Sequence, residues 1–106
     1  GKIMQSHLKK IHDEIHSGQA QLLDVREENE WEAGHLKAAQ LVPLSELAQG
    51  REPKSIDKSK KTYLHCRSGN RVYQAAPLLE KMGFQSVIPM DEGFEDLAYE
   101  GFEEAK

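Results

Sequence analysis

The chain has 106 residues, which fits a single domain over residues 1–106 with its own core and without metal or disulfide cross-links. Hydrophobic residues make up 38% and charged residues 30% of the chain, an ordinary composition for a soluble protein. The formal net charge is -4 and no run is strongly basic, so nucleic acid is not an expected partner; no apolar run reaches the ~20 residues of a membrane span.

The N-terminal half alternates helix-like and strand-like segments. Apolar side chains recur at helical spacing over residues 6–17, where Ser6 is the expected N-cap and Gly18 the stop. The remaining predictions for this half are strands over residues 21–25 and 40–42 and helices over residues 28–33 and 44–48.

The C-terminal half repeats this alternation after a polar loop over residues 50–61. Strands are predicted over residues 62–65 and 86–88, and a last helix over residues 93–99. The most regular helical pattern covers residues 71–82 and contains Pro77, which is expected to kink the helix or make its first half irregular.

Strands that alternate with helices predict an α/β fold, with a mostly parallel sheet and helices on both faces. In such sheets, ligands bind beyond the carboxyl ends of the strands. The residues that follow the strand ending at His65 are therefore the first place to look for a functional site.

The six residues Cys66-Arg67-Ser68-Gly69-Asn70-Arg71 lie between that strand and the most regular helix. Gly69 and Asn70 tolerate positive φ and Ser68 is small, so the segment suits a tight loop whose N–H groups turn inward as an anion-binding nest. The N-terminus of the following helix, with the charges of Arg67 and Arg71, adds positive potential.

Cys66 stands at the mouth of this nest and is the only cysteine, so no intrachain disulfide can form. A lone cysteine is either a small core residue or a reactive thiol, and the loop composition favours the reactive thiol. Inward N–H groups and nearby guanidiniums stabilise a thiolate, so the pKa of Cys66 is expected to fall below the ~8.5 of a free thiol.

Other polar residues have simpler explanations. Asp24 and Arg26 follow a predicted strand and are expected to support the site as an ion pair, or to bind substrate directly. His12 and His16 are spaced for one metal on a helix, but no third ligand is apparent, so no metal site is predicted. His65 should face away from Cys66, because adjacent strand residues point to opposite faces.

Five segments, taken in order, resemble the rhodanese family. They are the strand with Asp-x-Arg (Leu22 to Glu27), the acidic-aromatic pair before Gly-His (Glu30 to Leu36), Val42-Pro43 with Leu44 and Leu47, the loop Cys66 to Arg71, and Gly83 to Val87 followed by Glu92-Gly93-Phe94. The departures from the family pattern are Ala38, Leu41, Val72, Glu92 and Leu97.

This resemblance implies a rhodanese-like sheet of about five strands and transfer of sulfane sulfur through a persulfide on Cys66. It implies a small anionic sulfur donor such as thiosulfate, an acceptor such as cyanide or a protein thiol, and no metal or organic cofactor. Arg67, Ser68, Gly69, Asn70 and Arg71 would bind the donor, with Asp24 and Arg26 in support.

Two other functions remain open. The chain could be a binding, regulatory or sulfur-carrier module without small-molecule turnover. It could also be a phosphatase, but the cell-cycle phosphatases that resemble this family carry one more loop residue, and no general acid is obvious here. The sequence does not indicate the oligomeric state.

The compartment is expected to be the cytoplasm, because no signal peptide is recognisable. Since the chain begins with Gly1 rather than Met, a mature or trimmed form of an exported protein, or a domain excised from a longer one, is the alternative.

Overall fold

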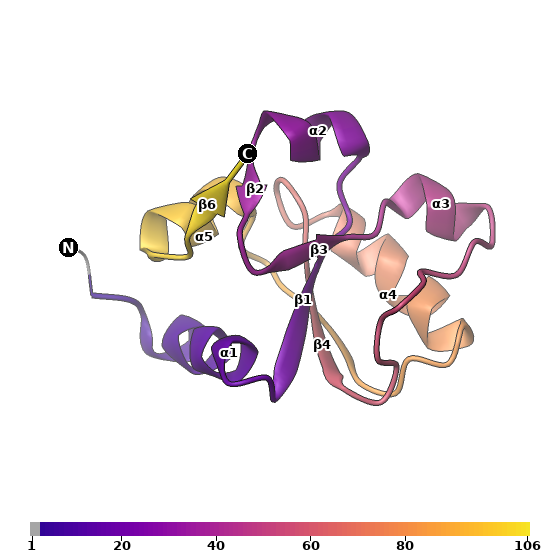
Figure 1. The fold of residues 1–106 in the computed structure, drawn as a ribbon, viewed down its shortest axis with the longest axis horizontal. Coiled ribbons are helices and arrows are strands. Elements are labelled where there is room, and N and C mark those ends of the chain that lie inside the picture. The colour runs from indigo at the N-terminus through magenta and orange to yellow at the C-terminus, as the bar shows by residue number, and fades with distance from the viewer. Residues whose placement is uncertain (1–2) are drawn as a thin grey trace.

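The computed structural model describes residues 3–106 as an α/β fold in which helices enclose a central sheet (Figure 1). The helices are α1 (Ser6–His16), α2 (Glu28–Ala33), α3 (Leu44–Ala48), α4 (Arg71–Lys81) and α5 (Phe94–Glu100). The strands are β1 (Ala20–Asp24), β2 (His35–Leu36), β3 (Ala39–Leu41), β4 (Lys61–His65), β5 (Val87–Pro89) and β6 (Glu104–Ala105).

The central sheet has four parallel strands in the order β3-β1-β4-β5. β1 and β4 are its inner strands, and they are paired so that Asp24 lies beside His65 at their carboxyl ends. β2 and β6 form a separate antiparallel pair, so the central sheet has one strand fewer than the resemblance implies.

Two apolar clusters, one on each face of the sheet, confirm that helices cover both faces. Leu23 and Leu64 of the sheet pack with Leu47 of α3 and Leu79 of α4 on one face. On the other face, Leu22 and Tyr63 of the same strands pack with side chains of α1 and α5. Alternate residues of β1 and β4 therefore serve opposite cores, as expected for a sheet buried on both sides.

The predicted helices and strands all occur, with boundaries shifted by at most one residue. The N-cap prediction was wrong: Gln5 occupies that position without a side-chain hydrogen bond, and Ser6 is the first helical residue. The helix over Arg71–Lys81 continues through Pro77. The short pair β2–β6 had not been predicted, because two-residue strands have no periodicity to detect.

The carboxyl ends of the inner strands form one edge of the sheet, where β4 passes into the loop before α4 (Figure 1). This edge carries Asp24, His65 and Cys66, and Asp24 had been expected near it. Within residues 3–106, no helix is both long and apolar enough to cross a membrane.

Candidate active site

Cys66 directly follows β4, and the loop that it begins turns back toward its own sulfur. Gly69 has a φ of +84°, a conformation that costs glycine little, and its N–H donates to Sγ of Cys66 at 3.2 Å. α4 then starts at Arg71, so the N–H groups of its first turn have no partner within the helix. The loop therefore surrounds one sulfur atom with backbone donors.

These donors lower the pKa of Cys66. Burial raises the pKa of the thiol, but the backbone N–H groups of Val72, Ser68, Gly69 and Arg71 lower it by more, so the net shift is downward. The thiolate is thus favoured by hydrogen bonds from peptide groups, as the loop composition had led us to expect.

The sulfur is also deeply placed. Cys66 is only 1% exposed and belongs to the apolar cluster under α4, together with Leu64 and Val72. Arg67, Ser68 and Asn70 of the same loop are exposed. The loop therefore has a buried inner side that stabilises the sulfur anion and an outer side that faces solvent.

Arg71 is bonded to a carboxylate that the sequence analysis had not identified as functional. Its guanidinium donates to both carboxylate oxygens of Glu30, at 2.6 and 2.9 Å. A capping box at the start of α2 holds Glu30 in place, because Glu30 also accepts from the N–H of Glu27 at 3.0 Å. The hydrogen bonds from Arg71 are the main reason that the pKa of Glu30 falls to about 2.

Asp24 and Arg26 form a buried ion pair, which was the expected supporting arrangement. Arg26 Nη2 donates to Asp24 at 2.8 Å and to the carbonyl of Gly34 at 2.9 Å, and the guanidinium lies 4.4 Å from the ring centre of Phe94. Arg26 and Phe94 line a shallow pocket of about 220 Å³ together with Arg67. Glu30 and Glu95 lie in the same wall.

Residues 7–100 match the model of the rhodanese-like domain family. The chain belongs to that family. YqhL, an uncharacterized protein of Bacillus subtilis, is 41% identical over 75 residues, which are 71% of this chain and 58% of YqhL. The putative sulfur carrier protein YrkF of the same bacterium is 33% identical over 75 residues, covering 71% of this chain and 40% of YrkF.

This rhodanese-like chain thus spans no more than about three fifths of either relative. Among solved structures, the human single-domain sulfurtransferase TSTD1 has a TM-score of 0.74 at 24% identity, over 87% of this chain and 92% of TSTD1. That likeness shows a shared fold.

The three arginines near the site of the rhodanese-like chain differ in how far their charges are compensated. Arg26 is paired with Asp24 and Arg71 with Glu30. Among the residues that the structure describes, no ion pair involves Arg67. The exposed Arg67 is therefore the guanidinium with the most freedom to meet an anion.

His65 is fully buried and faces away from the sulfur. Its Nδ1 lies 3.2 Å from the carbonyl oxygen of Cys66, and its Nε2 lies 3.7 Å from Asp24 without a hydrogen-bond partner among residues 3–106. Burial is the main cause that lowers the pKa of His65, so the neutral ring is favoured. Because adjacent residues of a strand point to opposite faces, the ring is not placed to serve as a base for Cys66.

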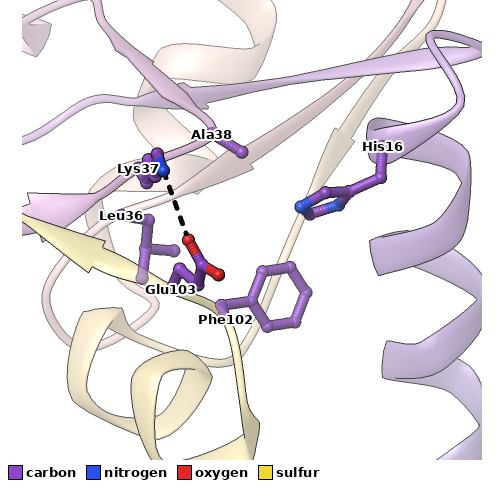
Figure 2. A pocket seen from close by; sticks show the side chains of 6 residues that line it. All are labelled: His16, Leu36, Lys37, Ala38, Phe102 and Glu103. Carbon is purple, nitrogen blue, oxygen red and sulfur yellow. Dashed lines mark ion pairs between the residues drawn. The ribbon is translucent and has the colours of Figure 1, made fainter.

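Two other features lie apart from Cys66. His12 and His16 stack at 3.9 Å, and within the described part of the chain no group of three His, Cys, Asp or Glu side chains could hold a metal. His16 also lines an apolar pocket of about 310 Å³ next to Phe102, with Lys37 and Glu103 paired at its rim (Figure 2). No residue of the Cys66 loop lines that pocket.

The first prediction concerns the acidity of Cys66. Because the amide donors outweigh burial, the rate of iodoacetamide alkylation should show a midpoint below the ~8.5 of a free thiol. Alkylation rates measured from pH 5 to 10 by mass spectrometry would give this midpoint. A midpoint at or above ~8.5 would contradict the stabilisation of the thiolate by the loop.

The second prediction concerns the Glu30–Arg71 pair. Glu30→Gln leaves the charge of Arg71 uncompensated, so the alkylation midpoint of Cys66 should fall further, while the free energy of unfolding should drop by about 1 kcal/mol. Glu28→Gln is the matched control, since it removes an exposed carboxylate from the same helix. Equal midpoints for the two variants would show that Arg71 does not act on the sulfur.

The third prediction follows from the lowered pKa of His65. In the unfolded chain His65 takes up a proton near its ordinary pKa of ~6.5, whereas in the folded chain its pKa is lower. The neutral ring therefore favours the folded state fully above pH ~6.5, and this contribution to the free energy of unfolding is lost as the pH falls further. Urea denaturation at several pH values would measure the free energy of unfolding. Between pH 7 and 5 this free energy should fall less steeply for His65→Phe than for the unchanged protein. His16→Gln, at an exposed histidine that forms no ion pair with a carboxylate among residues 3–106, serves as control. An unaltered slope in His65→Phe would refute the assignment.

Proposed function

We propose that this protein is a sulfurtransferase that takes sulfane sulfur from a small anionic donor such as thiosulfate and carries it as a persulfide on Cys66. The acceptor is a thiophilic species such as cyanide or a protein thiol. The observation that carries the proposal is the convergence of backbone N–H groups on Sγ of Cys66, with Gly69 donating at 3.2 Å. Donors so placed stabilise an anionic sulfur before and after transfer.

The transfer consists of two displacements at sulfur. The Cys66 thiolate attacks the outer sulfur of thiosulfate, the S–S bond of thiosulfate breaks, and sulfite leaves with the electron pair. Cys66 then carries a persulfide anion, so the total negative charge is unchanged. In the second step the acceptor attacks the outer persulfide sulfur, the new S–S bond breaks, and the thiolate is regenerated without an external oxidant or reductant.

The residues of the loop have distinct roles in this proposal. The amide groups of Ser68, Gly69, Arg71 and Val72 hold the charge of the sulfur. Arg67 attracts the donor, since a chain with a net charge of -4 otherwise repels anions. Asn70 and Ser68 lie exposed at the mouth, where they can hydrogen-bond the donor's oxygens.

Family membership supports sulfur chemistry, and the name of YrkF as a putative sulfur carrier agrees with a persulfide on the Cys66 loop. The ion pairs Asp24–Arg26 and Glu30–Arg71 support the loop from β1 and α2.

The fourth prediction is that incubation with thiosulfate adds one sulfur atom, about +32 Da by atomic mass, to the intact protein and none to Cys66→Ser. Subsequent cyanide should remove the added mass and release thiocyanate. Because Cys66 is the only cysteine, the added mass can be assigned without peptide mapping. Cyanide alone and thiosulfate with the serine variant are the two controls.

Three results separate the proposal from its alternatives. No mass gain with thiosulfate would reject thiosulfate as the donor. A gain with a protein persulfide but not with thiosulfate would favour a carrier module that exchanges sulfur with proteins. Cys66-dependent hydrolysis of an aryl phosphate would instead support phosphatase chemistry.

A further inference from the structure

The Cys66 loop rests on the segment that joins β5 to α5, residues 90–93, and on the first residue of α5. The N–H of Met90 donates to the carbonyl of Leu64 at 2.9 Å, which continues the pairing of β5 with β4. The N–H of Phe94 donates to the carbonyl of Cys66, also at 2.9 Å. The segment therefore runs alongside the nucleophile's own peptide group.

Gly93 lies against the loop with no room for a side chain. A Cβ atom at this position would lie 1.8 Å from the carbonyl oxygen of Arg67, 2.6 Å from its carbon and 3.1 Å from the nitrogen of Ser68. The backbone of Gly93 has φ -87° and ψ 179°, which any residue can adopt. Glycine is thus required here by the close approach of two backbones and not by its own conformation.

Gly69 makes the reciprocal contact from the loop side. A Cβ atom on Gly69 would lie 2.3 Å from the carbonyl oxygen of Asp91 and 3.1 Å from its carbon. Two glycines, one on each segment, therefore let the backbones touch at two points. Such contacts do not yield easily, because each displaced atom is main chain and not the flexible end of a side chain.

The peptide groups held at these contacts are among those that stabilise the sulfur. Ser68, whose nitrogen would be crowded by a Cβ on Gly93, supplies one of the N–H groups that lower the pKa of Cys66. Gly69, which touches Asp91, supplies the N–H at 3.2 Å from Sγ. Moving the segment by a few tenths of an ångström would therefore move two of the donors.

Side chains hold the segment on both sides. The hydroxyl of Tyr73, in the first turn of α4, donates to the carboxylate of Asp91. The carboxylate Oε2 of Glu92 lies 2.8 Å from Nε2 of His7 in α1, where it forms a hydrogen bond or an ion pair. These contacts connect the segment to helices on opposite faces of the sheet.

We propose that residues 91–93, fixed by Gly93 and by the Tyr73–Asp91 contact, position the amide groups of Ser68 and Gly69 and thereby determine how strongly the site stabilises a sulfur anion. Gly93 and Tyr73 are positioning residues in this account, since they act through peptide groups and need not touch the donor. This inference deepens the proposed sulfurtransferase function. It rests on that function only where it concerns the persulfide anion, because the effect on the thiolate can be measured without any sulfur donor.

The test compares Gly93→Ala, Tyr73→Phe and Gly50→Ala with the unchanged protein. Gly50 has φ +80° and open space around its Cβ position, so its alanine variant introduces backbone strain without contacting the loop. Tyr73→Phe keeps the ring and removes only the hydroxyl. The readout is the alkylation midpoint of Cys66, with circular dichroism and urea denaturation to establish that each variant folds.

For Gly93→Ala we expect the alkylation midpoint of Cys66 to rise by about one pH unit. At a pH well below this midpoint, the thiolate fraction would then be about tenfold smaller. A shift of this size corresponds to the loss of one hydrogen bond to a charged group. Tyr73→Phe should raise the midpoint by a smaller amount, and Gly50→Ala should lower stability without moving it. A folded Gly93→Ala protein with an unshifted midpoint would overturn the proposal. If Gly93→Ala does not fold, an unshifted midpoint in Tyr73→Phe overturns it instead.

The same variants separate this inference from the proposed function. Persulfide formation from thiosulfate is measured in parallel by the +32 Da gain of the intact protein, an increment set by the atomic mass of sulfur. If the unchanged protein takes up no sulfur while Gly93→Ala still raises the midpoint, the thiosulfate reaction fails and the positioning role stands. If the unchanged protein takes up sulfur but neither Gly93→Ala nor Tyr73→Phe moves the alkylation midpoint, the proposed function stands and the positioning role of residues 91–93 is rejected.

Discussion

The hydrogen bonds from backbone amides to one buried sulfur atom are the interaction on which the rest of this site depends. Cys66 belongs to an apolar cluster, where a thiol alone would stay protonated. The turn at Gly69 and the open first turn of α4 direct peptide N–H groups at Sγ. Burial and hydrogen bonding thus oppose each other, and the hydrogen bonds prevail because several of them converge on one atom.

The side-chain charges around the loop have a different purpose from the amides. The guanidiniums of Arg26 and Arg71 are compensated by Asp24 and Glu30, so they contribute geometry more than net positive charge. A peptide group, by contrast, offers partial positive charge without a counter-ion, and it keeps its orientation as long as the backbone does. A site that depends on amides is therefore sensitive to main-chain position and less sensitive to which charged side chains surround it.

Much of the fold could be predicted from local patterns, because each central strand is short, apolar and ended by a polar residue, Gly or Pro. The Cys66 loop could be located for the same reason: its residues suit a turn and it lies between a strand and a helix. The predictions for Pro77 and for the Ser6 cap each depended on a single residue. The helix begins one residue away from the predicted cap, with Gln5 as N-cap, and α4 continues through Pro77.

The missing parts of the site are long-range or have no side-chain signature. Glu30 and Arg71 are 41 residues apart, and their pairing depends on how α2 sits over the loop. The N–H of Val72 helps to lower the pKa of Cys66, yet any residue except proline would supply it. Val72 had stood out only as a departure from the family pattern, so its contribution through the backbone could not be inferred from its side chain.

Glu92 and Gly93 are adjacent, but the space that the structure leaves for a side chain differs sharply between them. Glu92 is one of the departures from the family pattern, whereas Gly93 is not. The side chain of Glu92 finds space beside His7, at 2.8 Å, so a bulky residue is accommodated at that position. At Gly93 the same addition would begin 1.8 Å from the carbonyl oxygen of Arg67. Of these two adjacent positions, Gly93 is the one that lies against the backbone around the sulfur, so a side chain is excluded there and is accommodated at Glu92.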